Sequence, residues 1–321
     1  MVVTGVAGFI GSHLAEALLA RGEQVTGLDA LTDSYPRAYK ERNLRALVGH
    51  PRFRFHELDL RHEGLQEVVR DADVVVNQAA LPGLPRSWND LRAYIDCNLL
   101  GLGRLLEASR HAGVSRFVQA STSSVYGIEA MGDETAPTQP VSPYGVTKLA
   151  AEQLLLAHVR THDFPAVILR YFSIYGPRQR PDMAYHIFTE ALREGRPVTV
   201  YGDGAQSRSN TYVADCVDGT LLAIEGATPG EIYNIGGGTS LELHEAIDLI
   251  AQELGVVPRL VHRPPRPGDQ RRTLADTAKA AEAFGYQPRT DPPEGLRSQV
   301  RWHLAELPVP SAVSPVAPAV G

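Results

Sequence analysis

The sequence predicts an α/β protein with a doubly wound parallel sheet of the Rossmann type and a smaller C-terminal α/β domain. Short apolar runs alternate with longer helical patterns over the first 165 residues, as in βαβ units. Three glycines lie between the first strand and the first helix. Beyond about Tyr175, proline and glycine become frequent and the elements shorter. We therefore expect a Rossmann domain over residues 1–175, to which some later segments return, a second domain over 176–307, and a disordered tail over 308–321.

Apolar periodicity places the elements in order along the chain. The expected strands of the first domain are residues 2–4, 24–28, 53–58, 72–78, 116–120 and 166–169, and its helices are 12–21, 91–112 and 142–162. The run 72–78 (ADVVVNQ) is apolar on both faces, which is typical of a buried parallel strand. The second domain is expected to hold helices 184–194, 213–225 and 243–254 and strands 198–200 and 231–235.

Composition excludes several classes of protein. The chain has 321 residues, enough for about two domains, with 43% hydrophobic and 21% charged residues, close to the globular average. Its net charge of −6 argues against nucleic-acid binding. Cys97 and Cys216 are too few for a disulfide framework or a four-cysteine zinc site, so we expect buried small residues and no metal. No long apolar stretch or basic leader is evident, so we expect no membrane association and a cytoplasmic location.

The glycine pattern predicts a phosphate-binding turn. Gly5, Gly8 and Gly11 allow the backbone to turn sharply and approach a pyrophosphate at the start of the following helix. Asp29 ends the second strand, 18 residues after Gly11, where a carboxylate can accept both ribose hydroxyls of an adenosine and repel a 2′-phosphate. The pattern favours NAD over NADP. The alternative is a glycine cluster that serves packing alone.

Two further patterns indicate chemistry. Tyr144 and Lys148 lie four residues apart in a helical segment, so both side chains share one face, and an ammonium group beside a phenol lowers its pKa. Four hydroxyl residues, Ser121 to Ser124, follow strand 116–120, where open α/β sheets bind ligands. The alternatives are a surface Tyr–Lys pair and a turn whose hydroxyls bond their own backbone.

Five motifs together resemble the extended short-chain dehydrogenase/reductase family of nucleotide-sugar enzymes. In chain order they are GVAGFIG, Asp29, STSSVYG, YGVTK and RYFSIYGPR, and the resemblance covers residues 1 to about 305. It implies tightly bound NAD, a nucleotide-sugar substrate and a homodimer joined by a four-helix bundle. Helices 91–112 and 142–162 would form that bundle.

The resemblance also implies site residues. The catalytic group would be Tyr144, Lys148 and Thr122. The cofactor would be held by Gly5, Gly8, Phe9, Ile10, Gly11, Asp29, Asp59, Leu60, Ala79, Ala80 and Asn98, with Tyr144 and Lys148. The substrate would be bound by Arg86, Ser123, Ser124, Ser173, Arg180, Thr199, Tyr201, Arg208 and Arg266. Among these, Arg180, Arg208 and Arg266 would clamp a diphosphate, because the planar guanidinium forms paired charge-assisted bonds.

The turn Thr122-Ser123-Ser124 narrows the expected reaction. Dehydratases of this family carry an acid–base pair there, and the absence of a carboxylate leaves oxidation and re-reduction at C4 of the sugar. The run RPDMA at 180–184 resembles the UDP-glucuronate 4-epimerases, whose substrate carboxylate would meet the hydroxyls of Thr122, Ser123, Ser124 and Ser173. A UDP-glucose/UDP-galactose 4-epimerase and a non-enzymatic NAD-sensing protein remain as alternatives.

Overall fold

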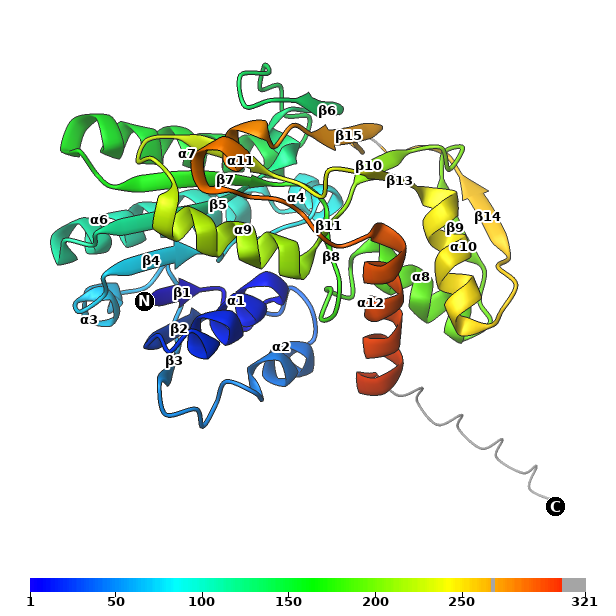
Figure 1. Ribbon diagram of the computed structural model, residues 1–321, viewed down its shortest axis with the longest axis horizontal. Helices are drawn as coiled ribbons and strands as arrows, with labels where there is room; N and C mark the ends of the chain where they lie inside the picture. Colours follow the sequence, from blue (N-terminus) through cyan, green and yellow to red (C-terminus); the bar gives the residue numbers. More distant parts are fainter. Residues whose placement is uncertain (267–268, 308–321) are drawn as a thin grey trace.

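The computed structural model describes residues 1–266 and 269–307, and its centre is a seven-stranded parallel sheet (Figure 1). The strand order is β12-β7-β5-β4-β1-β2-β3. The strands are β1 (Val2–Thr4), β2 (Val25–Asp29), β3 (Phe53–Glu57), β4 (Val74–Asn77), β5 (Arg116–Thr122), β7 (Ala166–Tyr171) and β12 (Ile232–Ile235). The order reverses between β1 and β4, and ligands of such sheets bind at that point, beyond the strands' carboxyl ends.

Helices cover both faces of this sheet and bury them. The elements on and around the first face are α1 (Phe9–Ala20), α2 (Arg37–Leu44), α9 (Val213–Gly226) and α11 (Ala278–Phe284). The other face carries α3 (Leu65–Val69), α6 (Leu102–Ala112) and α7 (Pro143–His162). Alternate strand residues point to opposite faces, so Val75 and Phe117 pack on α6 and α7 while Val76 and Val118 pack on α1 and α9. This explains why these strands are apolar throughout.

The second region is assembled around small sheets and three helices. A four-stranded sheet has the order β13-β10-β15-β6, and two-stranded pairs join β11 to β8 and β14 to β9. The strands are β6 (Glu129–Gly132), β8 (Ile174–Tyr175), β9 (Val198–Tyr201), β10 (Ser207–Ser209), β11 (Thr211–Tyr212), β13 (Ser240–Glu242), β14 (Leu260–Arg263) and β15 (Arg272–Ala275). Helices α8 (Ala184–Arg193), α10 (Leu243–Leu254) and α12 (Pro292–Glu306) enclose a separate apolar core.

The chain crosses between the two regions more than once. Strand β12 and helices α9 and α11 come after residue 176 yet pack on the seven-stranded sheet, whereas β6 pairs in parallel with β15 of the second region. Among the described residues, no helix is both long and apolar enough to cross a membrane. The residues predicted to form a tail, 308–321, lie outside the described part of the chain.

Two expected helices differ from those observed. Helix α1 begins at Phe9 rather than Ser12, so Phe9 and Ile10 belong to its first turn. The helix expected over 91–112 is three consecutive segments: α5 (Leu91–Ile95), the π-helical η1 (Asp96–Gly101) and α6. The π segment cannot be recognised from apolar spacing alone, because it inserts one residue into an otherwise continuous helix. Two other short helices are α4 (Leu84–Asn89) and η2 (Ser123–Val125).

Candidate functional site

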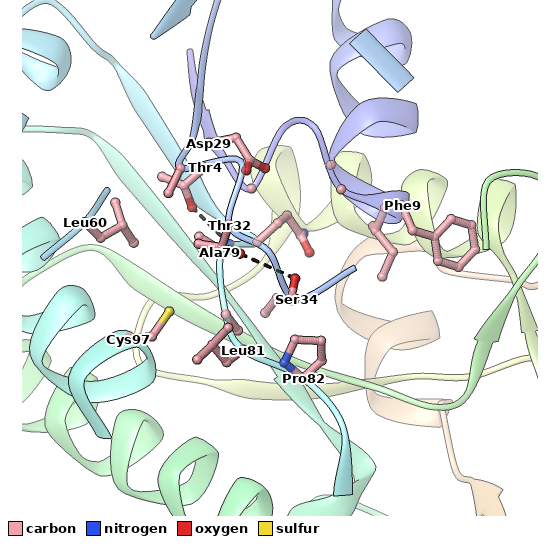
Figure 2. A pocket seen from close by; sticks show the side chains of 18 of the residues that line it. Thr4, Phe9, Asp29, Thr32, Ser34, Leu60, Ala79, Leu81, Pro82 and Cys97 are labelled. Atoms are coloured by element: carbon pink, nitrogen blue, oxygen red, sulfur yellow. Dashed lines mark hydrogen bonds between the residues drawn. The ribbon is translucent and has the colours of Figure 1, made fainter. Parts of the chain in front are cut away.

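A cleft lies at the carboxyl ends of β1, β2 and β4, where the strand order reverses. Side chains tie these strand ends together: the Thr4 hydroxyl donates to Asn77 (2.5 Å), and the Asn77 amide donates to Gln119 of β5 (2.9 Å). Thr4 also accepts from the backbone N–H of Ala79 (3.1 Å), as Figure 2 shows. Thirteen of the predicted site residues line the cleft: Gly5, Gly8, Phe9, Ile10, Gly11, Asp29, Asp59, Leu60, Ala79, Ala80, Tyr144, Lys148 and Arg180.

The glycine turn joins β1 to α1 without room for side chains. Gly5 has a φ of 67°, and its carbonyl accepts from the N–H of Gly8 (2.9 Å). A Cβ at Gly11 would lie 2.2 Å from the Gly5 carbonyl oxygen, which no side chain tolerates. The close packing brings the first turn of α1 to the floor of the cleft, so that its N–H groups and the positive end of its dipole are available to a phosphate group.

Asp29 is fixed at the mouth of this turn. Its carboxylate accepts from the N–H of Ala7 (3.1 Å) and of Leu31 (2.8 Å), and Lys40 of α2 lies 3.8 Å away. Burial raises the pKa of Asp29, while Lys40 and the two N–H groups act in the opposite direction. Thr32 and Ser34 also line this wall, with their hydroxyls 3.4 Å apart (Figure 2).

The far wall beside β3 is formed by Asp59, Leu60 and Arg61. Arg61 binds both carboxylate oxygens of Asp59 (2.9 Å and 2.6 Å) and thereby lowers the pKa of that carboxyl. Cys97 of η1 faces the same cleft, contrary to the expectation that it is a core residue, and burial raises the pKa of its thiol (Figure 2). Cys216, by contrast, is fully buried in the core.

Tyr144 stands at the start of α7, next to the turn that follows β5. Ser142 caps this helix by accepting from the N–H of Gly145 (3.1 Å), and a Cβ at Gly145 would lie 2.8 Å from the Ser124 carbonyl oxygen. Helix and turn therefore approach closely. Burial raises the pKa of Tyr144, while a hydrogen bond with Thr122 and the positive charge of Arg180 act to lower it.

Lys148 forms a hydrogen bond with the backbone of β5. Its Nζ donates to the Ala120 carbonyl (2.5 Å), and burial lowers its pKa to about 8 despite the nearby negative charge of Glu152. Arg180 supplies a positive charge that acts on the Tyr144 phenol, and the expected influence of Lys148 on the same pKa stays a prediction. Behind Lys148, the buried Glu152 accepts two hydrogen bonds from Arg170 (2.7 and 3.0 Å) and a short one from Ser121.

The hydroxyl turn is partly committed to protein contacts. Thr122 accepts from the N–H of Ser124 (3.1 Å), and its hydroxyl lies 3.2 Å from the Ser124 hydroxyl. The Ser123 hydroxyl donates to the buried Gln270 side chain (3.4 Å), whose amide donates back to the carbonyls of Ser123 (3.2 Å) and Gly127 (2.9 Å). Ser123 therefore faces protein, whereas Ser124 is only partly buried.

Four of the predicted substrate residues belong to the second region. Arg208 donates to the carbonyls of Gln270 and Arg271 (3.1 Å for the latter). The Arg266 guanidinium lies over the Tyr201 ring, 4.3 Å from its centroid, and its charge reaches Arg208. Thr199 lies on the same strand as Tyr201, two residues earlier. None of these four is among the residues lining the cleft described above.

Four other predicted residues take different places. The Asn98 side chain accepts from the backbone N–H of Leu81 (2.7 Å) and donates to the Leu81 carbonyl (3.1 Å). It thereby holds this segment of the cleft wall in place. Arg86 is exposed on α4 and lies 3.4 Å from the Ser34 carbonyl. Ser173 occupies a left-handed conformation with φ of 43°. Arg180, predicted to clamp a diphosphate, lines the cleft with Tyr144 and pairs with Asp182 (2.9 Å).

Several lining residues were not predicted from the sequence. They are Thr32, Ser34, Tyr35, Lys40, Arg61, Gln78, Leu81, Pro82, Cys97, Ser121 and Tyr171, together with Gln270 outside the cleft. For Tyr35 and Lys40 the available signal was their short distance in sequence from Asp29. The chain turns into α2 directly after this strand end, so residues there lie close to it. Gln270 carries no local signal, because its partner Ser123 is 147 positions away.

The cleft fits a dinucleotide. It offers the α1 N-terminus for a pyrophosphate, Asp29 for ribose hydroxyls and a wall formed by Leu60 and Arg61 for a base. Among the described residues, no group of three or more histidine, cysteine, aspartate or glutamate side chains could hold a metal ion.

Comparison with known proteins gives consistent matches. The model of the NAD dependent epimerase/dehydratase family matches residues 1–236. A UDP-glucuronic acid 4-epimerase from Bacillus cereus, crystallised with UDP-glucuronic acid and NAD, is 39% identical with a TM-score of 0.91, over 94% of this chain and 98% of that one. A Bacillus subtilis (strain 168) protein named as an uncharacterized UDP-glucose epimerase is 40% identical over 94% of this chain and 97% of its own. The dTDP-glucose 4,6-dehydratase DesIV from Streptomyces venezuelae is 34% identical with a TM-score of 0.89, over 95% and 97%.

Proposed function

Because the chain belongs to the NAD dependent epimerase/dehydratase family, we propose that it is a UDP-sugar 4-epimerase that interconverts UDP-glucuronate and UDP-galacturonate. NAD is the cofactor of this protein. The observation that carries the choice of reaction is the turn after β5, where Thr122, Ser123 and Ser124 place hydroxyls, and no carboxylate, beside Tyr144. Bound NAD supplies reversible hydride acceptance at C4 of the sugar, so the cofactor ends unchanged.

Among the described residues, the carboxylate that faces the Tyr144 site is Asp182, which pairs with Arg180, and this argues against dehydration. Elimination of water from a keto sugar needs a general acid and a general base beside the reacting carbons. Among the described residues that line the cleft, the carboxylates are Asp29 and Asp59, and both are engaged at the cofactor end by N–H groups or by Arg61. Simple oxidation and re-reduction at C4 requires only one group that exchanges a proton with the C4 hydroxyl.

Tyr144 is the group proposed to exchange that proton. Its phenol oxygen would accept the C4 hydroxyl proton on oxidation and return it on reduction, with Thr122 as a hydrogen-bonding partner. The Arg180 charge favours the phenolate that this role requires. Lys148 lies on the same face of α7 as Tyr144. Its ammonium group, which donates to the Ala120 carbonyl, would bind ribose hydroxyls of the cofactor.

The second region is proposed to hold the UDP part of the substrate. Arg208 and Arg266 lie within electrostatic range of each other, and a diphosphate between them would relieve their mutual repulsion. Thr199 and Tyr201 of β9 are the proposed uracil-side contacts, and Arg86 the contact from α4. Arg208 is held by main-chain carbonyls, which fix its direction, while Asp269 offsets part of the repulsion from Arg266.

The glucuronate carboxylate is proposed to meet hydroxyls rather than a cation. The candidates are Thr122, Ser124 and Ser173, with Ser123 as the least available because it donates to Gln270. Several hydroxyls can hold a carboxylate in the plane of the neighbouring C–C=O unit. That orientation matters because a 4-keto uronate is a β-keto acid and loses CO₂ when the carboxylate turns out of this plane.

A homodimer is the proposed assembly. Apolar side chains are exposed on the helices that would form a four-helix bundle: Leu91 of α5 is 48% exposed, Leu100 of η1 55% and Val146 of α7 51%. Burying such side chains against a second copy is favourable by about 25 cal/mol per Å². Light scattering of the purified protein tests the proposed dimer, and Leu100→Asp should give monomers.

A substrate panel tests the proposed reaction. The purified, NAD-loaded protein would be incubated separately with UDP-glucuronate, UDP-glucose, UDP-galactose and dTDP-glucose, and the products resolved by NMR. We expect UDP-galacturonate from the first and little or slow change of the others. Conversion of UDP-glucose alone would assign the neutral-sugar epimerase, a 4-keto-6-deoxy product would assign a dehydratase, and binding without turnover would favour an NAD-sensing protein.

A further inference from the structure

We propose that the buried side chains of Gln179 and Gln299 form an amide clamp that holds the turn 176–180 and thereby positions Arg180 beside Tyr144. The turn follows β8 and carries Arg180 into the cleft. The two glutamines touch neither cleft nor reacting atoms, so they are positioning residues. The inference rests on the proposed role of Tyr144 as the group that exchanges a proton.

The turn has a conformation that its own sequence does not favour. Arg178 adopts a left-handed conformation with φ of 66°, which is costly for a residue with a side chain. Gly176, at φ of 134°, packs so closely that a Cβ would lie 2.7 Å from Val213 Cγ1. Such a turn persists only where the surrounding structure holds it in place.

The two glutamines hold the turn in place on the side that faces α12. Gln299 of α12 accepts from the N–H of Gly176 (2.8 Å) and donates to the Gln179 side-chain oxygen (2.8 Å). That oxygen also accepts from the N–H of His186 (3.0 Å), and the His186 ring donates to the Gln179 carbonyl (3.0 Å). Gln179 is 4% and Gln299 1% exposed, so a lost partner would leave a buried polar group unpaired.

The outer side of the turn is fastened to the first helix of the dinucleotide fold. His13 bonds the Pro177 carbonyl (2.9 Å), and Arg178 donates to Ser12 (3.2 Å) and Glu16 (2.7 Å). With α1 on one side and α12 on the other, every residue from 176 to 179 has a fixed partner. The next residue, Arg180, is the one whose side chain reaches the cleft.

The charge that the turn delivers acts on the phenol. Arg180 is paired with Asp182 (2.9 Å), yet its positive charge still favours the ionised form of Tyr144. The titratable or charged groups that face this site from the packed elements are Tyr35, Arg86, Tyr94, Lys148 and Asp182. None of them is hydrogen-bonded to Gln179 or Gln299, so a change in the clamp would act through Arg180.

Burial disfavours the charged form of the two histidines around the clamp. Burial, reinforced by His303, lowers the pKa of His186 to about 4. Burial also lowers the pKa of His303, whose ring bonds Glu190. Protonation of His186 therefore lies well below the range in which Tyr144 titrates, so the two titrations do not overlap.

The test measures the ionisation of Tyr144 directly. NAD-loaded protein would be titrated by near-ultraviolet phenolate absorbance, and the Tyr144 signal obtained by subtracting the same protein with Tyr144→Phe. We expect Gln299→Leu to raise the pKa of Tyr144, and so to lower its phenolate fraction at neutral pH about tenfold. Val300→Ala is the matched control, because Val300 is the next residue of α12 and equally buried but bonds nothing in the turn.

Three further results decide the matter. Arg180→Met should raise the same pKa, and adding Gln299→Leu to it should change little more; an additive shift would overturn the route through Arg180. Equal pKa values in Gln299→Leu and Val300→Ala would overturn the clamp. If Gln299→Leu does not fold, Gln299→Met keeps the shape and serves instead. The titration needs no substrate, whereas the substrate panel measures turnover. The clamp can therefore be refuted while the proposed epimerase activity is confirmed, and the clamp can be confirmed while that activity is refuted.

Discussion

The cofactor end of the cleft and the sugar end are built in different ways. At the cofactor end, the contacts of Asp29 with Ala7, Leu31 and Lys40 lie within the first 40 residues, and Thr4 joins the next strand of the same sheet through Asn77. At the sugar end, the contacts join distant segments, as with Ser123 and Gln270 or Arg208 and Arg271. The first end is therefore fixed within the seven-stranded sheet, whereas the second depends on how the two regions of the chain meet.

The largest expected effect is a loss of turnover at the sugar end that leaves cofactor binding at the other end unchanged. Tyr144→Phe should lower kcat at least a hundredfold, because it removes the proton-exchanging oxygen, and should leave NAD bound, because ring and packing remain. Turnover would be followed by NMR and bound NAD measured after denaturation. A variant that keeps most of its turnover would show that Tyr144 is not the base; a variant that loses NAD would show that the two ends are not separable.

The next effect resolves members of the sugar end. Ser124→Ala and Ser173→Ala should each lower kcat/KM for UDP-glucuronate roughly ten- to a hundredfold, since a hydrogen bond to a charged group contributes about 1.5–3 kcal/mol. The neutral UDP-glucose should lose less. Ser123→Ala is the comparison variant: its hydroxyl binds Gln270, so it should affect both sugars alike.

The same variants should also release more CO₂. A carboxylate held by fewer hydroxyls turns out of plane more often, so the share of 4-keto-pentose should rise in Ser124→Ala and Ser173→Ala but not in Ser123→Ala. Equal losses on both sugars without extra CO₂ in all three variants would mean that the hydroxyls only stabilise the turn.

A smaller effect is expected at the cofactor end, where removing either charge of the Asp29–Lys40 pair should change the preference for NAD over NADP in opposite directions. Asp29→Asn should weaken the preference for NAD over NADP about tenfold, because Lys40 remains to attract a 2′-phosphate. Lys40→Met should strengthen that preference. Reconstitution of cofactor-free protein with each dinucleotide measures both. A shift in the same direction for the two variants would contradict the assignment of this pair.

The smallest effect concerns the pH dependence of stability. The pKa values of His13 and His186 are lowered from 6.5 to about 4, in both cases mainly by burial. Both bases are thus harder to protonate in the folded state, so their contribution to stability is present above about pH 6.5 and is lost as the pH falls toward 4. Tm should fall over this window, and less steeply in His13→Gln. An unchanged slope in that variant would rule out His13 as a source.

These differences explain what the sequence could predict. The glycine turn, Asp29 and the helix that carries Tyr144 follow from local spacing, and six strands of the parallel sheet follow from alternating apolar runs; the seventh, β12, was expected in the second domain. The pairing of Gln179 with Gln299 and of Ser123 with Gln270 joins residues more than a hundred positions apart, and glutamine has no periodic signature. The hydrogen bond from Lys148 to the Ala120 carbonyl could not be predicted for a related reason: four-residue spacing gives a common helix face but not the backbone group that the ammonium meets.

The return of β12 to the first sheet has a consequence for biosynthesis. Ile168 of β7 pairs with Ile232 of β12, so the strand that completes this side of the sheet is translated 64 positions later. At roughly 5–20 residues per second, the wholly buried strand β7 remains an uncovered edge on the nascent chain for several seconds. During that interval the emerging polypeptide presents an unpaired strand edge, which is a β-aggregation hazard.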